Sequence, residues 1–358
     1  MDKEFIPQNL PPKQDIETKK ILKKAIEANK ALAKLNGCYK IIPNSNILIS
    51  SLSLQEAQSS SAIENIITTQ DELYKATIDI SHMTQEAKEV QHYRKALLMG
   101  YDFVKKNGLL LKKDIVNIQE QLEQNKAGVR RQSGTKLINP STKEIILVPP
   151  QSFETIEDLL KNLEQYINEP NKIDALINMA IIHYQFESIH PFYDGNGRTG
   201  RIINILYLVL KNLLDIPILY LSDYIIKNKQ NYYKLLQEVR TKNSWEDWIL
   251  YILSAVETTS LQTISFINGV NDIMEATKKN IKNNAPKIYS KDLLELLFEN
   301  PYITINIIVN SLKISRQTAS KYIEKLIELD ILSINLILKK KKYYINKKLF
   351  ERLKQGLS

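Results

Sequence analysis

The sequence predicts a mainly helical, all-α protein with a small β component, and its composition and apolar spacing carry this prediction. Only 10 Gly and 12 Pro occur in 358 residues, and long stretches place apolar residues at steps of three and four. One break in this pattern, at residues 128–150, has the alternation and the turn residues of a short hairpin. We therefore expect a helical body with one hairpin, followed by a smaller C-terminal unit.

Composition places the chain among globular proteins of a reducing compartment. Hydrophobic residues make up 43% of the chain and charged residues 25%, which is enough apolar material for a buried core. The one cysteine, Cys38, cannot form an internal disulfide, and the first residues lack the order of a secretory signal. The most apolar stretch, residues 202–219, is interrupted by polar residues and by Pro217. We expect a cytoplasmic protein with no membrane span.

The net charge of +9 is concentrated near the C-terminus, where residues 286–358 hold 14 Lys and Arg against 7 Asp and Glu. A basic segment can bind nucleic acid through its phosphates, but lysines on solvated faces give the same count. Charge alone therefore leaves both alternatives open.

Apolar spacing also predicts the positions of the elements in the body. The expected helices are residues 15–35, ended by Asn36 and Gly37, and residues around 54–63, 158–167, 173–189, 201–214 and 245–266. The strands of the hairpin are expected at residues 135–138 and 144–148.

The last part of the chain has the element order of a winged helix-turn-helix. Helices are expected at residues 291–298, 305–312 and 316–329, the last one capped by Ser315, followed by a strand pair around 339–342. Residues 278–285 are polar enough to form a linker. The expected domains are an N-terminal helical region (1–110), a core (111–277), the linker (278–285) and a winged-helix domain (286–358).

Residues 190–201, HPFYDGNGRTGR, have the composition of a phosphate-binding loop. The string lies between two helical patterns, so its glycines stand at the N-terminus of the second helix. Free backbone N–H groups there attract an anion, and Gly195 and Gly197 let the backbone approach it closely. Arg198 and Arg201 lie on one helical face and can contact further phosphate oxygens. Two arginines favour a polyphosphate ligand.

Two other phosphate motifs do not fit this context. Gly195, Gly197 and Gly200 match the spacing of the dinucleotide fingerprint, but that motif follows a strand, and helical spacing precedes it here. A P-loop needs Lys and then Ser or Thr after its last glycine, and none follows. We therefore set both classes aside.

His190 and Asp194 flank the expected anion site. A neutral imidazole can take the proton of an attacking hydroxyl, and a carboxylate can hold a magnesium ion that bridges phosphates. A metal site made of His183, Glu187 and His190 is an alternative, although the chain has no HExxH pattern. The first interpretation predicts phosphoryl or nucleotidyl transfer to a hydroxyl.

Residues 190–201 match every fixed position of the signature HPFxDGNGRxxR, and the chain thereby resembles the Fic family. The hairpin followed by Pro149 and Pro150, and the winged-helix unit after the core, extend the resemblance more loosely over most of the chain. It implies a helical core in which His190 activates a hydroxyl of a target protein for attack on the α-phosphate of ATP. Gly197 differs from the kinase-like Doc members and favours transfer of AMP.

The resemblance also implies roles for individual residues. Asp194 would hold Mg²⁺, while Gly195, Asn196 and Gly197 would bind the phosphates of ATP together with Arg198. Arg201 would reach the γ-phosphate. The hairpin would be the family's target flap, with Lys136, Leu137 and Ile138 pairing with an extended segment of the target protein.

Ser60, Glu64 and Asn65 resemble the family's inhibitory pattern, [S/T]xxxE[G/N]. A Glu64 carboxylate paired with Arg201 would remove the partner of the γ-phosphate and misplace ATP. This resemblance therefore predicts an enzyme that is held mostly inactive by Glu64.

Other functions stay open at this point. Arg316, Gln317, Ser320 and Lys321 at the start of the expected recognition helix, together with residues 339–342 in the wing, could bind DNA. Winged helices also contact proteins or form dimers, so a homodimer is a further expectation. Glu64 could alternatively position water for removal of AMP from a modified target. The identity of the target protein is not encoded in these motifs.

Overall fold

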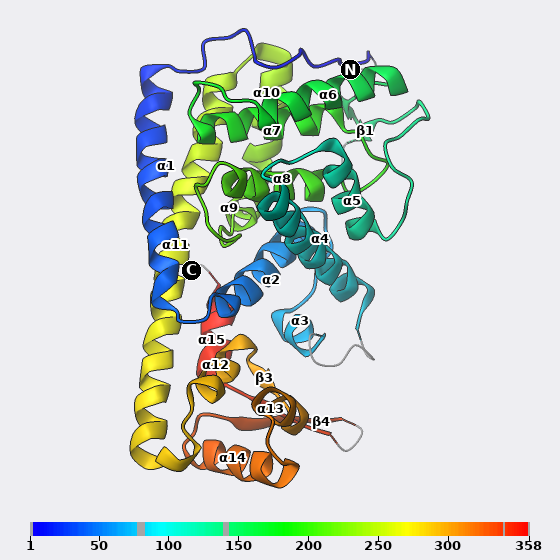
Figure 1. The fold of residues 1–358 in the computed structure, drawn as a ribbon. Helices are drawn as coiled ribbons and strands as arrows, with labels where there is room; N and C mark the ends of the chain where they lie inside the picture. Colours follow the sequence, from blue (N-terminus) through cyan, green and yellow to red (C-terminus); the bar gives the residue numbers. More distant parts are fainter. Residues whose placement is uncertain (1–2, 77–82, 139–142, 339–340, 357–358) are drawn as a thin grey trace.

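The computed structural model describes residues 3–76, 83–138, 143–338 and 341–356. Within them the chain is mainly helical, as predicted, with two small antiparallel sheets. The molecule is elongated: helix α11 (Trp245–Asn284) runs along one side, from the helical body to a smaller C-terminal unit (Figure 1). Among the described residues, no helix has the length and apolar character needed to cross a bilayer.

The body is built from helices that surround two buried ones. They are α1 (Lys19–Cys38), α2 (Ser45–Ile63), α3 (Gln70–Ala76), α4 (Gln85–Asn107), α5 (Lys112–Glu123), α6 (Phe153–Asn168), α7 (Ala175–Ile189), α8 (Asn196–Leu210), α9 (Ser222–Lys227) and α10 (Lys229–Lys242). Helices α7 and α8 pack against each other and are apolar on most faces. They form the centre of the core because α4, α6 and α11 cover them.

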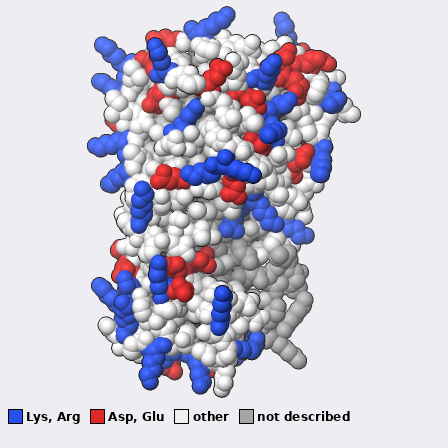
Figure 2. Space-filling view, in the orientation of Figure 1, with Lys and Arg blue, Asp and Glu red and all other residues white. Residues whose placement is uncertain are grey.

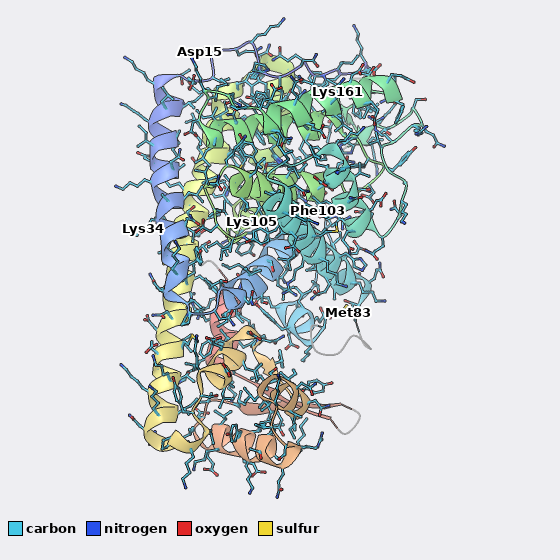
Figure 3. The ribbon with its side chains drawn as sticks, viewed as in Figure 1. Asp15, Lys34, Met83, Phe103, Lys105 and Lys161 are labelled. Atoms are coloured by element: carbon cyan, nitrogen blue, oxygen red, sulfur yellow. The ribbon has the colours of Figure 1, made fainter. Side chains whose placement is uncertain are left out.

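Helix α1 differs from its prediction at both ends. It begins at Lys19 because the side chain of Thr18 accepts a hydrogen bond from the backbone N–H of Ile21 and caps the first turn. It continues through Asn36 and Gly37 to Cys38, so the prediction that these two residues end the helix is wrong. The helix packs along α11, while its outer face carries exposed side chains such as Lys34 (Figure 3).

The predicted hairpin is present as β1 (Leu137–Ile138) and β2 (Ile145–Leu147). Leu137 pairs with Leu147 and Ile138 with Ile145, and the register shifts between the two pairs. The turn at residues 139–142 lies outside the described residues.

The C-terminal unit comprises three helices, a three-stranded sheet and a final helix. Its elements are α12 (Lys291–Glu299), β3 (Tyr302–Ile303), α13 (Ile305–Leu312), α14 (Arg316–Glu328), β4 (Ser333–Leu338), β5 (Lys341–Ile345) and α15 (Lys347–Gln355). The strand order is β3-β5-β4, and both pairings are antiparallel. Ser315 caps α14 as predicted, with its hydroxyl accepting from the backbone N–H of Thr318. Strand β3 was not predicted because a two-residue strand has no periodicity.

The connection between the body and the C-terminal unit is helical, contrary to the expected polar linker at 278–285. Helix α11 runs to Asn284, and a short 3-10 turn at Pro286–Ile288 follows. The apolar side chains of Met274 and Ile281 are buried on its inner face. Because most of their sequence neighbours are polar, the sequence pattern did not indicate this buried face. The body and the C-terminal unit therefore share one continuous helix.

Candidate active site

The loop between α7 and α8 brings His190 and the start of α8 together. His190 ends α7 in the left-handed conformation (φ 48°), with its backbone N–H donating to the carbonyl of Phe186 at 3.0 Å. Gly195 precedes α8 and has φ 77°, a conformation that favours glycine. Helix α8 begins at Asn196 and not at residue 201, where the sequence predicted its start. The glycine-rich string therefore forms the first turn of α8. Its free N–H groups are able to bind an anion.

The side chain of Asn196 holds this loop closed. Its Oδ1 accepts from the backbone N–H of Phe192 at 2.9 Å, and its Nδ2 donates to the carbonyl of Phe192 at 2.9 Å. The Phe192 ring is fully buried. The amide of Asn196 is thus occupied inside the loop, which leaves its backbone N–H as the group available to a phosphate.

Arg130 anchors the same loop from outside, and the sequence did not indicate this role. Its Nε donates to the carbonyl of His190 at 2.8 Å, and its Nη2 donates to the carbonyls of Pro150 and Ile189. The backbone N–H of Arg130 also donates to the carbonyl of Pro191 at 2.9 Å. Since Arg130 is far from the loop in sequence and lies outside the signature, no local pattern could have identified it.

Arg201 is held by the end of α2. Its Nε donates to the Ser60 hydroxyl at 2.7 Å, and its Nη2 donates to the Ser60 carbonyl at 3.0 Å and to Glu64 Oε1 at 2.8 Å. The Arg201 side chain is 1% exposed. The structure therefore brings together three residues that the sequence singled out from distant positions.

Glu64 stands at the anion site itself. It follows the last turn of α2, and an added Cβ at Gly197 would lie 2.4 Å from Glu64 Oε1, so the carboxylate lies directly against the first turn of α8. Burial raises the pKa of Glu64, but the charge and hydrogen bond of Arg201 outweigh it and lower the pKa below its usual value. The neighbouring Asn65 adopts a left-handed conformation and accepts from Lys229 Nζ at 3.3 Å.

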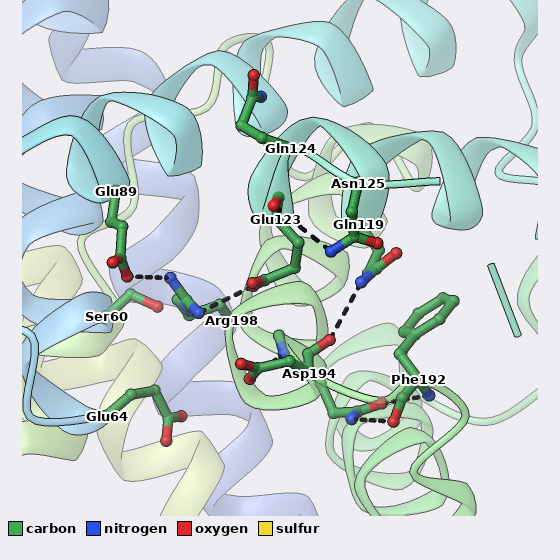
Figure 4. Close-up of polar contacts among 12 residues, drawn as sticks. Ser60, Glu64, Glu89, Gln119, Glu123, Gln124, Asn125, Phe192, Asp194 and Arg198 are labelled. Carbon is green, nitrogen blue, oxygen red and sulfur yellow. Dashed lines mark hydrogen bonds and ion pairs between the residues drawn. The ribbon is translucent and has the colours of Figure 1, made fainter. Parts of the chain in front are cut away.

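Arg198 is paired with two carboxylates that the sequence did not indicate (Figure 4). Its Nη2 donates to Glu123 Oε1 at 2.8 Å, and its Nη1 donates to Glu89 Oε2 at 3.3 Å. Glu123 also faces Gly195, where an added Cβ would lie 2.4 Å from Glu123 Oε1. Both arginines of the signature are therefore occupied by carboxylates of the chain.

Asp194 lies exposed at the mouth of the loop. Its Oδ1 accepts from the backbone N–H of Gly195 at 2.7 Å, and its carbonyl accepts from Gln119 Nε2 at 3.2 Å. An exposed carboxylate beside a phosphate-type site is a ligand that Mg²⁺ accepts, with water and phosphate oxygens completing the coordination. The chemistry of this position fits a magnesium ion.

His190 and Glu187, at the end of α7, both have pKa values shifted toward their neutral forms. Burial, together with the positive charges of Arg130 and Arg240, lowers the pKa of His190 to about 4. His190 is therefore neutral near pH 7, as a proton acceptor must be. Burial raises the pKa of Glu187, which is 8% exposed, to about 7.

The alternative metal site is not assembled. His183 Nε2 lies 2.8 Å from the Tyr232 hydroxyl, and its ring stacks on Trp248 with centroids 5.9 Å apart, so it is a buried core residue. In the part of the chain that the structure describes, no three His, Cys, Asp or Glu residues gather as metal ligands.

An open cleft of about 1380 Å³ lies beside the site. Its lining includes Glu64, Glu187 and Tyr233, and the flap contributes Leu137 and Ile138. Of the three flap residues expected to meet a target, Lys136 is exposed and does not line the cleft. The cleft is large enough for a nucleotide and part of a target segment.

The fold and the loop together define a helical protein with a candidate anion site at the N-terminus of a buried helix. Three family models match consecutive parts of the chain: Fic/DOC family N-terminal at residues 22–102, Fic/DOC family at residues 109–208, and the C-terminal domain of SoFic-like protein adenylyltransferases at residues 273–349. The chain belongs to the Fic/DOC family.

Curated relatives agree with this placement, and a solved structure shares the fold. The chain is 32% identical over 90 residues to a probable protein adenylyltransferase of Aquifex aeolicus, and 39% identical over 56 residues to the protein adenylyltransferase fic-1 of Caenorhabditis elegans. These matches span 25% and 15% of this chain, and 25% and 11% of the respective relatives. A Fic family protein from Desulfovibrio desulfuricans has the same fold, with a TM-score of 0.59 at 19% identity, covering 94% of this chain and 98% of that one.

Proposed function

We propose that this protein transfers AMP from ATP to a hydroxyl side chain of a target protein. The observation that carries the proposal is the loop at 190–196, which joins a neutral histidine to an anion site with two buried arginines beside it. The relatives named as protein adenylyltransferases support the same activity for this chain.

The residues of the loop would divide the reaction between them. His190 would take the proton of the target hydroxyl as its oxygen attacks the α-phosphorus of ATP. The bond between the α- and β-phosphates breaks, and pyrophosphate leaves. The N–H groups at Gly195, Asn196 and Gly197, with Arg198 and Arg201, would bind the phosphates. Asp194 would hold Mg²⁺, which supplies charge neutralisation on the phosphates.

We propose that the resting enzyme is inhibited by Glu64. Its carboxylate occupies Arg201 and lies on the first turn of α8, where the phosphates of ATP would be placed. A carboxylate at this point repels a triphosphate and removes an arginine from it. The same residue could position water for the reverse reaction, which would release AMP from a modified target.

The test uses ATP labelled at the α-phosphate, with Mg²⁺ and a cell lysate as the source of target. We expect label on protein with the Glu64→Gly enzyme and none with Glu64→Gly/His190→Ala. Label transferred from the γ-phosphate alone would replace this proposal by phosphate transfer. Mass spectrometry of the labelled protein then identifies the target.

A second activity, DNA binding by a winged helix-turn-helix in the C-terminal unit, is favoured by helix α14. Arg316, Gln317 and Lys321 are exposed in its first turns, where a recognition helix contacts bases. Lys and Arg are spread over the face shown in Figure 2 and do not form one patch, so the proposal depends on α14. Duplex binding that weakens with salt and with Arg316→Ala/Lys321→Ala supports it, and unchanged binding in that variant rejects it.

A further inference from the structure

The segment that carries Glu64 lies between two helices that both contact the C-terminal unit. We call residues 59–69, the last turn of α2 and its connection to α3, the Glu64 segment. Helix α2 leads into it and α3 follows it. Figure 1 shows the C-terminal unit directly beneath both helices.

Helix α2 is bonded to the C-terminal unit near its start and in its middle. Asn44 caps α2 by accepting from the backbone N–H of Asn46, and its Nδ2 donates to Glu295 Oε2 at 3.1 Å and to Glu299 Oε1 at 3.2 Å on α12. Further along, Gln55 Nε2 donates to the carbonyl of Leu353 on α15 at 3.5 Å. The helix that ends at Glu64 is therefore fixed to α12 and α15.

Helix α3 is bonded to the same unit through β3 and α15. The hydroxyl of Tyr302, a fully buried residue, donates to the carboxylate of Asp71. The ring of Phe350 meets both Tyr74 and Tyr302 edge to face, with centroids 6.4 and 5.7 Å apart. A hydrogen bond from a buried hydroxyl to a carboxylate is among the stronger kinds, so α3 is held in one position.

The Glu64 segment is too tightly tied to these helices to move without them. Gln58 Nε2 on α2 donates to the carbonyl of Thr68 at 2.8 Å. Glu72 on α3 accepts from the backbone N–H of Thr69 at 3.0 Å and from the hydroxyl of Thr68 at 2.9 Å. A displacement of α3 therefore moves the connection that positions Glu64.

We propose that the C-terminal unit controls inhibition by holding α2 and α3 so that Glu64 stays on Arg201. A ligand that displaces the unit from these helices would free Arg201 for ATP, and nucleotide binding would in turn weaken the docking, because coupling between two sites is reciprocal. The two states are Glu64 paired with Arg201 and Glu64 released. The catalytic consequence of this inference rests on the proposed function.

The experiment removes docking contacts on the C-terminal side alone. One variant is Glu295→Ala/Glu299→Ala, which deletes the acceptors for Asn44 and keeps its helix cap. The other is Tyr302→Phe, which keeps the buried ring. The matched control is Glu328→Ala/Glu351→Ala, because Glu328 pairs with Lys325 on its own helix and Glu351 is exposed, so the same charge is removed from the same unit.

We expect each docking variant to raise AMP transfer at least about fivefold, the factor that corresponds to a loss of ~1 kcal/mol of hydrogen bonding. Combined with Glu64→Gly, neither docking variant should raise the rate above that of Glu64→Gly alone. The control should leave the rate unchanged both in the wild type and in Glu64→Gly. A rate increase that persists in the Glu64→Gly background would overturn the inference, since it would not act through Glu64.

A second readout does not depend on catalysis. Amide hydrogen exchange in residues 59–69 should become about fivefold faster in both docking variants and stay unchanged in the control. Unchanged exchange in folded docking variants would overturn the inference. If Glu64→Gly transfers no label from ATP, the proposed function fails, and the exchange measurement still decides whether the C-terminal unit holds the Glu64 segment.

Discussion

Glu64 Oε1 accepts a hydrogen bond from Arg201 Nη2 at 2.8 Å and lies against the backbone of Gly197 at the same time. One carboxylate therefore occupies both the arginine and the helix N-terminus that would receive the phosphates of ATP. The Glu64 side chain is 35% exposed, whereas the Arg201 side chain is 1% exposed. Release is thus easier for Glu64 than for Arg201, and we expect the regulated movement to be that of Glu64.

The first prediction concerns the strength of this contact. Glu64→Gly should raise the initial rate of AMP transfer at least about tenfold, because an ion pair with a buried arginine contributes more than the ~1 kcal/mol of a surface pair. Glu64→Gln should give a smaller increase, since the amide keeps a hydrogen bond to Arg201 but loses the charge. Equal rates for all three proteins would contradict inhibition by Glu64.

The second prediction concerns Arg198. Glu123 pairs with it at 2.8 Å and stands over Gly195, so it too competes with a phosphate. Glu123→Gln in the Glu64→Gly background should tighten ATP binding about threefold to tenfold, measured by titration calorimetry. Glu120→Gln, the same change on the same helix, serves as the control. Weaker ATP binding in Glu123→Gln would mean that Glu123 orients Arg198 for the phosphates.

The loop and the contact of Ser60 and Glu64 with Arg201 could be predicted because their patterns are local. The string at 190–201 specifies a turn and a helix start by its glycines, and the pattern at Ser60 and Glu64 is a helical spacing. The carboxylates of Glu89 and Glu123 could not be found this way. They come from two other helices, α4 and α5, and only tertiary packing brings them to Arg198.

The same distinction applies to the fold. Strongly amphipathic or apolar helices such as α7 and α13 were predicted close to their observed bounds. The polar end of α11 has the sequence pattern of a linker because its few apolar residues, such as Ile281, are widely spaced. That part of the helix is stabilised by burial against the C-terminal unit, and such a tertiary contact cannot be predicted from the spacing of apolar residues.

The third prediction tests Arg130 as the anchor of the loop. Arg130→Met keeps most of the side-chain volume but leaves the carbonyls of Pro150 and His190 without this donor. We expect a loss of about 2 kcal/mol in the free energy of unfolding, measured in urea, and a lower kcat with little change in KM for ATP. Arg131→Met is the control, because the exposed Arg131 guanidinium lies over the Phe153 ring and the variant keeps the backbone N–H that donates to the Tyr193 hydroxyl. Equal losses in both variants would show that Arg130 has no special role.

The fourth prediction concerns the buried carboxyl of Glu187, whose pKa is raised to about 7 by burial. In the unfolded chain this group ionises near pH 4.5, so between pH 4.5 and 7 the folded protein binds more protons than the unfolded one. Glu187 therefore stabilises the fold most below pH 4.5, and this contribution is lost as the pH rises to 7, by at most about 3 kcal/mol.

The experiment must separate Glu187 from two buried histidines. The pKa values of His183 and His190 are lowered, so these residues make the folded protein more stable as the pH rises. Their contribution is the same in the wild type and in Glu187→Gln, so it cancels in the difference between the two proteins. The difference in unfolding free energy, wild type minus Glu187→Gln, should fall between pH 4.5 and 8 in urea titrations. A flat difference for Glu187→Gln would mean that the carboxyl is ionised and paired in the folded protein.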